Sequence, residues 1–121
     1  MPNRRSLYIL YILLLMLMPA KAGAQINTEQ VLNIGRNALY FEDYVLSIQY
    51  FNQVIKAKPY LAEPYFYRAV AKINLDDYQG AEQDCDKALE INPFIVDAYQ
   101  VRGIARQTLN KYREAVSDYD M

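Results

Sequence analysis

The stretch YFYRAVAKINLDDYQGAEQDCDKALEINP, residues 65–93, predicts two short amphipathic helices joined by a turn. Tyr65, Ala69 and Ile73 recur at helical spacing, and Asp76-Asp77 then marks a turn. A second apolar stripe follows, and Pro93 ends it because the proline ring clashes with the carbonyl four residues back. The stretch therefore predicts a helical hairpin.

The hairpin recurs along the chain at a fixed period. Tyr44, Tyr78 and Tyr112 are evenly spaced, and Pro59 and Pro93 are separated by the same interval. Three further positions at this spacing hold only small residues, which let paired helices approach closely: Gly35, Ala69 and Gly103. A single hairpin cannot bury its own apolar face, so repeated hairpins are expected to stack.

Residues 28–121 carry the pattern of a known repeat family, which has Leu-Gly and tyrosine on the first helix and alanine, phenylalanine and proline on the second. The matching places hold Ile34-Gly35, Ser47, Phe51 and Pro59, then Arg68-Ala69, Ala81, Cys85 and Pro93, then Arg102-Gly103, Ala115 and Tyr119. This pattern resembles the tetratricopeptide repeat family. The resemblance implies an all-α, right-handed superhelical solenoid of antiparallel helix hairpins, with about 2.75 repeats.

The period places repeats at residues 28–61, 62–95 and 96–121, the last being shorter than the other two. The last apolar face of a solenoid needs a cover. We therefore expect either that the natural protein continues past Met121 or that a partner covers the last helix.

Residues 1–24 have the parts of an export signal of bacterial type. Arg4 and Arg5 precede an apolar run from Leu7 to Met18, and the small residues Ala22-Gly23-Ala24 follow. As a helix, the run spans about 18 Å, less than the roughly 30 Å hydrocarbon core of a bilayer. We expect cleavage after Ala24 and export across the inner membrane to the periplasm or cell envelope. An uncleaved segment that anchors the chain in the membrane is the alternative.

The composition argues against several classes of function. The net charge is −1 and no basic stripe is present, so a nucleic-acid partner is not expected. The chain has no histidine and a single cysteine, Cys85, on an apolar stripe. A turn explains Asp76-Asp77, and a solvated helix face explains Asp84 and Asp86, better than a metal site does. We therefore expect no enzymatic activity, no cofactor and no metal, and no membrane contact beyond the N-terminal segment.

One position of the first helix departs from the family pattern and predicts ion pairs. Where the family has leucine, the first repeat keeps Ile34, but the next two carry Arg68 and Arg102. The matching positions of the second helix in those two repeats are Asp84 and Asp118. We expect Arg68 to pair with Asp84, and Arg102 with Asp118, because the arginine fork meets a carboxylate through two hydrogen bonds. Pairing between neighbouring repeats, and arginines reaching solvent along their stems, are the alternatives.

The resemblance also implies a concave face lined mainly by the first helix of each repeat. On that face the sequence places a candidate peptide-binding groove: Leu32, Arg36, Leu39, Tyr40, Phe66, Val70, Ile73 and Ile104. An apolar groove with one arginine suits an extended or helical peptide, so we expect an exported scaffold that binds a protein or peptide partner.

Two alternatives to this groove stay open. Its residues could pack against a further segment or a neighbouring subunit. The repeats could also form the non-catalytic N-terminal arm of a longer cell-envelope protein, with an enzymatic or carbohydrate-handling domain beyond residue 121. Some family members clamp the C-terminal carboxylate of heat-shock chaperones with lysines and asparagines; the matching places here hold Leu32, Arg36, Tyr67, Asp97 and Val101. Only Arg36 could contribute to such a clamp.

Overall fold

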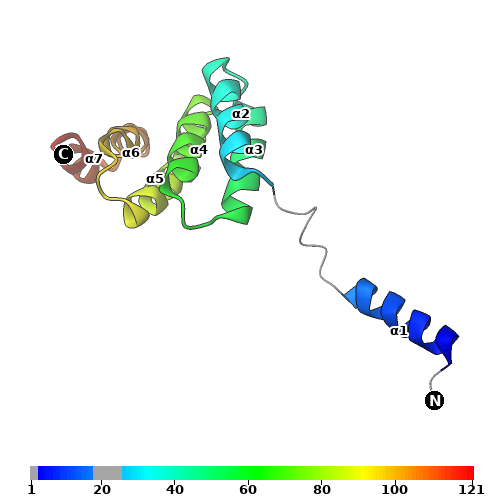
Figure 1. Ribbon diagram of the computed structural model, residues 1–121. Helices are drawn as coiled ribbons and strands as arrows, with labels where there is room; N and C mark the ends of the chain where they lie inside the picture. The colour runs from blue at the N-terminus through cyan, green and yellow to red at the C-terminus, as the bar shows by residue number, and fades with distance from the viewer. Residues whose placement is uncertain (1–2, 18–25) are drawn as a thin grey trace.

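The computed structural model describes residues 3–17 and 26–121, and this part of the chain contains helices and no strands (Figure 1). The helices are α1 (Arg4–Leu17), α2 (Thr28–Tyr40), α3 (Tyr44–Ala57), α4 (Ala62–Asn74), α5 (Tyr78–Ile91), α6 (Val96–Thr108) and α7 (Tyr112–Tyr119). The predicted all-α array of helix hairpins is confirmed. The expected cleavage site at Ala22-Gly23-Ala24 lies outside the described residues.

The helices from α2 onward form three antiparallel pairs, α2–α3, α4–α5 and α6–α7, which stack in one row (Figure 1). From α2 to α6, each helix packs on the next one in the chain. The first helices also contact one another, because α2 touches α4 and α4 touches α6. Within residues 26–121, no such contact joins α3 to α5 or α5 to α7. The first helices of successive pairs therefore lie closer together than the second helices do.

The turn inside each hairpin has the same backbone geometry. Glu42, Asp76 and Asn110 each have a positive φ, of 64°, 62° and 63°. After Glu42, the N–H of Asp43 donates to the carbonyl of Ala38 at 2.8 Å, and the other two turns make the equivalent bond. This is the Schellman ending of a helix, which satisfies carbonyls that the helix leaves free. Equal turns give the hairpins equal shapes, and equal shapes can stack.

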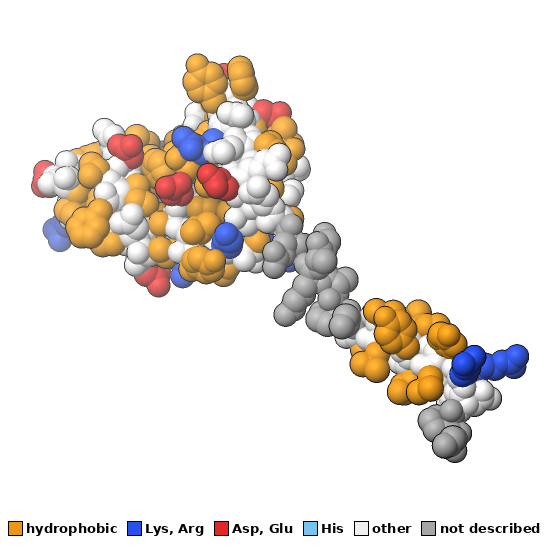
Figure 2. Space-filling model, viewed as in Figure 1, with side chains coloured by type: hydrophobic (Ala, Val, Ile, Leu, Met, Phe, Trp, Pro, Cys, Tyr) orange, Lys and Arg blue, Asp and Glu red, His pale blue; other side chains and the backbone are white. Residues whose placement is uncertain are grey.

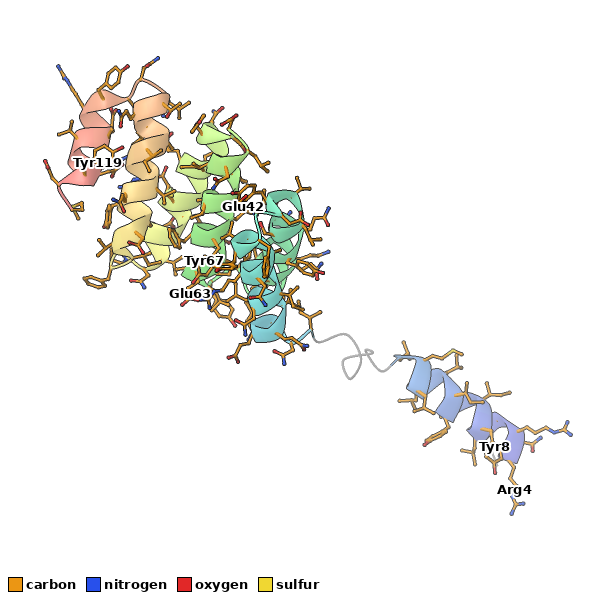
Figure 3. All side chains as sticks on the ribbon, turned by 90° about the horizontal axis from the view of Figure 1, so that it is seen from above. Arg4, Tyr8, Glu42, Glu63, Tyr67 and Tyr119 are labelled. Carbon is orange, nitrogen blue, oxygen red and sulfur yellow. The ribbon has the colours of Figure 1, made fainter. Side chains whose placement is uncertain are left out.

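The contact between the paired helices is set by one small residue opposite one larger residue. A Cβ atom added at Gly35 would lie 2.7 Å from Cε1 of Phe51, and one added at Gly103 would lie 2.7 Å from Cε1 of Tyr119 (labelled in Figure 3). These distances are too short for a real side chain. The interpretation of both glycines as packing glycines is therefore confirmed.

In the middle hairpin, Ala69 and Cys85 occupy the equivalent positions, and both are fully buried. Together with Ala81 and Ala105 they form the central apolar cluster, against which Ile73 packs. Burial raises the pKa of the Cys85 thiol to about 12. The thiol therefore stays protonated and acts as a small apolar group in the core.

The N-terminal helix α1 packs on none of the other described helices, and its side chains are exposed (Figure 1). No helix in the described parts of the chain has both the length and the apolar character needed to cross a membrane.

Candidate functional site

The eight residues predicted to form a groove lie on the first helices of the three pairs. Those on α2 and α4 occupy neighbouring helices that touch, and Ile104 lies on α6, which touches α4. All eight keep some exposure to solvent: Leu32, Leu39, Phe66, Val70 and Ile73 are partly buried, and Arg36, Tyr40 and Ile104 are exposed. Their role in binding stays a prediction. We call the face formed by α2, α4 and α6 the first-helix face.

An aromatic cluster joins the first two hairpins on this face and positions Arg36. The guanidinium carbon of Arg36 lies 5.2 Å from the centre of the Tyr67 ring, a cation–π distance. Tyr67 stacks on the buried Phe51 at 5.8 Å and contacts Phe66 at 5.4 Å. Figure 3 shows Tyr67 on the side of α4 that faces α2. The cluster therefore holds the charge of Arg36 at the surface beside apolar rings.

No ion pair within the described residues neutralises the charge of Arg36, and the same holds for Lys56, Lys58 and Arg113. Arg36 lines a shallow hollow of about 530 Å³ together with Asn33, Asn37 and Tyr40 of the same helix. Its donors are thus free to meet an acceptor from outside the chain.

A second hollow, of about 450 Å³, lies where α2 and α4 begin and α5 ends. Its lining includes Leu32, one of the predicted groove residues. The remaining lining residues are not among the eight predicted groove residues: Thr28, Glu29, Lys58, Tyr60, Leu61, Ala62, Glu63, Pro64, Ile91 and Asn92. Tyr60 and Leu61 lie in the turn between α3 and α4, outside any helical period, so the apolar pattern of the helices gave no signal for them. We call this hollow the α2–α4 cavity.

Behind the first-helix face, Arg68 meets Asp84 across the second hairpin. Nε of Arg68 donates to Oδ2 of Asp84 at 2.8 Å, and Nη2 donates to Oδ1 at 2.6 Å. Nη1 donates to Oδ1 of Asn52 in the preceding hairpin at 2.8 Å. Asp84 is only 4% exposed, and the hydrogen bond with it raises the pKa of Arg68. The charge of Arg68 is therefore taken up inside the protein.

Arg102 repeats this arrangement one hairpin later. Its Nη2 donates to Oδ1 of Asp118 at 2.7 Å, and its Nη1 donates to Oδ1 of Asp86 in the preceding hairpin at 2.9 Å. Burial alone would lower the pKa of Arg102, but the hydrogen bonds with Asp118 and Asp86 outweigh it and the pKa is raised. Asn52 and Asp86 occupy the same position in successive repeats, so each arginine links its own hairpin to the one before it.

Further ion pairs, which the sequence analysis missed, surround these two. Lys72 lies 3.0 Å from Asp84, and Arg106 lies 2.9 Å from Asp118. Lys72 and Arg106 follow Arg68 and Arg102 by one helical turn, a spacing that could have identified them.

Glu82 on α5 adds a link to the last hairpin. Its carboxylate accepts hydrogen bonds from Arg106 at 2.9 Å and from Lys111 at 2.7 Å. Burial alone would raise the pKa of Glu82, but these two bonds outweigh it, and the pKa is lowered. The ion pairs join neighbouring helices, so their role is structural. Across residues 3–17 and 26–121, no buried side-chain nitrogen or oxygen lacks a hydrogen-bond partner.

Comparison with known proteins agrees with this architecture. The family model described as tetratricopeptide repeat (TPR) matches residues 62–94. The solved TPR domain of Arabidopsis OM64 has 34% sequence identity and a TM-score of 0.75, and the match covers 77% of this chain and 77% of that one. No curated protein sequence matches the chain.

Two further solved structures are complexes. The second TPR of Spaghetti (RPAP3), bound to the HSP90 peptide SRMEEVD, has 27% identity and a TM-score of 0.75; the match covers 77% of this chain and 86% of that one. The TPR2B domain of yeast Sti1, in complex with pHsp70, has 28% identity and a TM-score of 0.74, with coverage of 77% and 74%.

Proposed function

Because the chain belongs to the tetratricopeptide repeat family, we propose that it is a non-catalytic scaffold that binds a protein or peptide partner through its first-helix face. The observation that carries the proposal is the surface around Arg36. There, a guanidinium without an ion-pair partner among the described residues rests on Tyr67, and the partly buried Phe66 and Val70 lie on the same helix as Tyr67. Such a mixture of apolar surface and one directed charge is typical of peptide-binding grooves.

The packing of the helices supports a concave shape for this face. The first helices of successive hairpins touch, whereas the second helices of the described hairpins do not. When the first helices of a row of hairpins lie closer together than the second helices, the row curves toward the first helices. The first helices then form the inner, concave side. A peptide crossing α2 and α4 would meet Leu39, Phe66 and Val70.

The peptide complexes among the solved TPR structures support peptide binding without indicating the same ligand. At the five positions where the resemblance implies a carboxylate clamp, this chain has only one basic residue, Arg36, and it has an acid at Asp97. We therefore propose a partner other than a chaperone C-terminus.

We further propose that residues 1–24 direct export and are removed after Ala24, which would place the scaffold in the periplasm or cell envelope. The support is the charge and length of the segment: Arg4 and Arg5 begin α1, and a short apolar helix follows. N-terminal sequencing of the protein recovered from the cell envelope tests this proposal. A mature chain that starts at Gln25 supports it, and an intact N-terminus indicates the membrane-anchored alternative.

A second candidate function, as the non-catalytic arm of a longer cell-envelope protein, is favoured by the surface of α7. Tyr112, Val116 and Tyr119 are 60%, 58% and 46% exposed there. A following helix could cover these side chains, as neighbouring repeats do in a solenoid. Sequencing the reading frame beyond codon 121 tests this candidate directly.

Site-specific crosslinking tests the binding face. A photoreactive amino acid at Phe66 on α4 should capture a partner in the cell envelope, and the same amino acid at the exposed Gln83 on α5 is the matched control. Crosslinks confined to position 83 would contradict binding through the first-helix face.

A further inference from the structure

We propose that the α2–α4 cavity holds an apolar side chain of the partner peptide, and that Glu29 and Glu63 beside it bind a basic residue next to that side chain. This inference rests on the proposed function and narrows the class of partner. The partner segment would contain lysine or arginine adjacent to an aliphatic or aromatic residue.

The shape and lining of the cavity fit an apolar side chain. Its volume of about 450 Å³ lies in the range of ligand pockets, roughly 300–1,000 Å³. Leu32 of α2, Leu61 of the α3–α4 turn and Ile91 of α5 line it, and all three are only partly buried. Tyr60, which is 65% exposed, stands beside them. Filling the cavity would remove apolar surface of these residues from water, which favours binding.

The charges around the cavity favour a cationic neighbour for that side chain. Glu29 and Glu63 both line the cavity, and both are exposed. Neither takes part in an ion pair with any cation of the described chain, including Lys58, which also lines the cavity. Glu63, labelled in Figure 3, lies in the first turn of α4. Two carboxylates and one ammonium group give the lining of the cavity a net negative charge, so the cavity attracts a positive charge.

Stabilisation of the helix N-termini by these two acids is the competing explanation, and a third acid distinguishes it from ligand binding. Glu29, Glu63 and Asp97 each lie in the first turn of a first helix, where a negative charge stabilises the helix. Asp97 has this benefit without lining the cavity. It is therefore a matched control for the effect of an acid at that helix position.

Helix α2 also carries a positive charge, and this gives a bound peptide a direction. Arg36 follows Glu29 by two helical turns, so it lies on the same side of α2 and about 10 Å further along the axis. The first-helix face thus runs from negative near the cavity to positive at Arg36; Figure 2 shows acidic and basic side chains close together over α2 and α4. About three residues of extended peptide cover this distance. An acidic group about three residues from the basic one would therefore meet Arg36.

Selection from a phage-displayed library of random heptapeptides with a central leucine tests the inference on the full chain. We expect enrichment of lysine or arginine next to the leucine. We also expect enrichment of aspartate or glutamate about three positions from that basic residue. In the double variant Glu29→Gln, Glu63→Gln, the basic preference should fall about two- to fivefold, the effect of losing partly exposed ion pairs. Asp97→Asn should leave the preference unchanged.

The outcomes distinguish this inference from the function on which it rests. Selected peptides without a basic preference, or a preference that survives in the double variant, would overturn the inference. If those peptides still lose affinity when Phe66 is changed to alanine, the first-helix face binds peptides and the proposed function stands. A library that yields no binding peptides at all would contradict both.

Discussion

Arg68 and Asp84 are joined by two hydrogen bonds, from Nε to Oδ2 at 2.8 Å and from Nη2 to Oδ1 at 2.6 Å. The third nitrogen of the same guanidinium donates to Asn52 of the preceding hairpin. One arginine therefore holds together α4, α5 and α3. Arg68 closes its own hairpin through Asp84 and, through Asn52, also contributes to the stacking of that hairpin on its neighbour.

Removing Asp84 should destabilise the fold strongly. Asp84→Ala leaves Arg68 and Lys72 facing the position of a lost carboxylate that was 4% exposed. Breaking a buried ion pair costs about 3–5 kcal/mol; because both cations reach solvent in part, we expect about 3 kcal/mol in urea unfolding. Asp86→Ala, at the half-exposed partner of Arg102, should cost about 1 kcal/mol or less.

The double variant Arg68→Leu, Asp84→Ala separates two causes of this loss. If the unpaired charge dominates, the double variant should be more stable than Asp84→Ala by about 1 kcal/mol or more. Equal stability of the single and double variants would contradict a buried, charge-dominated pair. The same urea titration measures both proteins.

The two packing glycines should respond differently to alanine. At Gly35 the new Cβ meets Phe51, which is fully buried, so overpacking of about 1–3 kcal/mol should exceed the gain in helix propensity of about 1 kcal/mol. At Gly103 it meets Tyr119, which is 46% exposed and can move outward. Thermal unfolding should show a lower Tm for Gly35→Ala and an unchanged or higher Tm for Gly103→Ala. A similar loss at both positions would contradict this difference.

The sequence predicts this fold well because the hairpin is encoded three times. The recurrence of arginine with aspartate also predicted the partner of Arg68, since a charge on an apolar stripe needs a nearby opposite charge. The sequence left open whether the pairs lie within or between hairpins. The structure shows that the arginine bonds in both directions, because three of its nitrogens can donate.

The α2–α4 cavity could not be predicted in the same way. It combines the starts of two helices with Tyr60 and Leu61 of a turn, and such a combination depends on how the hairpins stack rather than on any local pattern. Repeat position alone predicts the groove residues, and their role in binding stays a prediction.

Glycine at position 42 should stabilise the protein. Glu42 has a φ of 64°, a left-handed conformation that costs a residue with a Cβ atom about 1–2 kcal/mol. Because glycine also gains entropy on unfolding, we expect Glu42→Gly to add about 0.5–1 kcal/mol to the free energy of unfolding. Glu42→Ala is the control, since it removes the same carboxylate and keeps the Cβ atom. If alanine stabilises as much as glycine, charge rather than backbone strain explains the effect.

Cys85 should make the fold sensitive to alkaline pH. Burial raises the pKa of its thiol to about 12, so in the unfolded chain the thiol loses its proton near its ordinary pKa of about 8.5–9 while the folded protein retains it. A raised pKa in the folded state gives stability that is complete below the unfolded pKa and is lost as the pH rises toward 12. The loss attributable to Cys85 should approach about 1.4 kcal/mol per pH unit above pH 9.

Urea unfolding at pH 8 and pH 10 of the wild type and of Cys85→Ala measures this loss. Alanine creates a small cavity, so the variant should start less stable at pH 8. Because tyrosines and lysines titrate in both proteins, only the difference between the two slopes reports on Cys85. We expect the wild type to lose roughly 1.4–1.9 kcal/mol more than the variant over this interval. Equal losses of stability in the two proteins would show that the Cys85 thiol is not shielded from solvent. That result would contradict its full burial between α4 and α5.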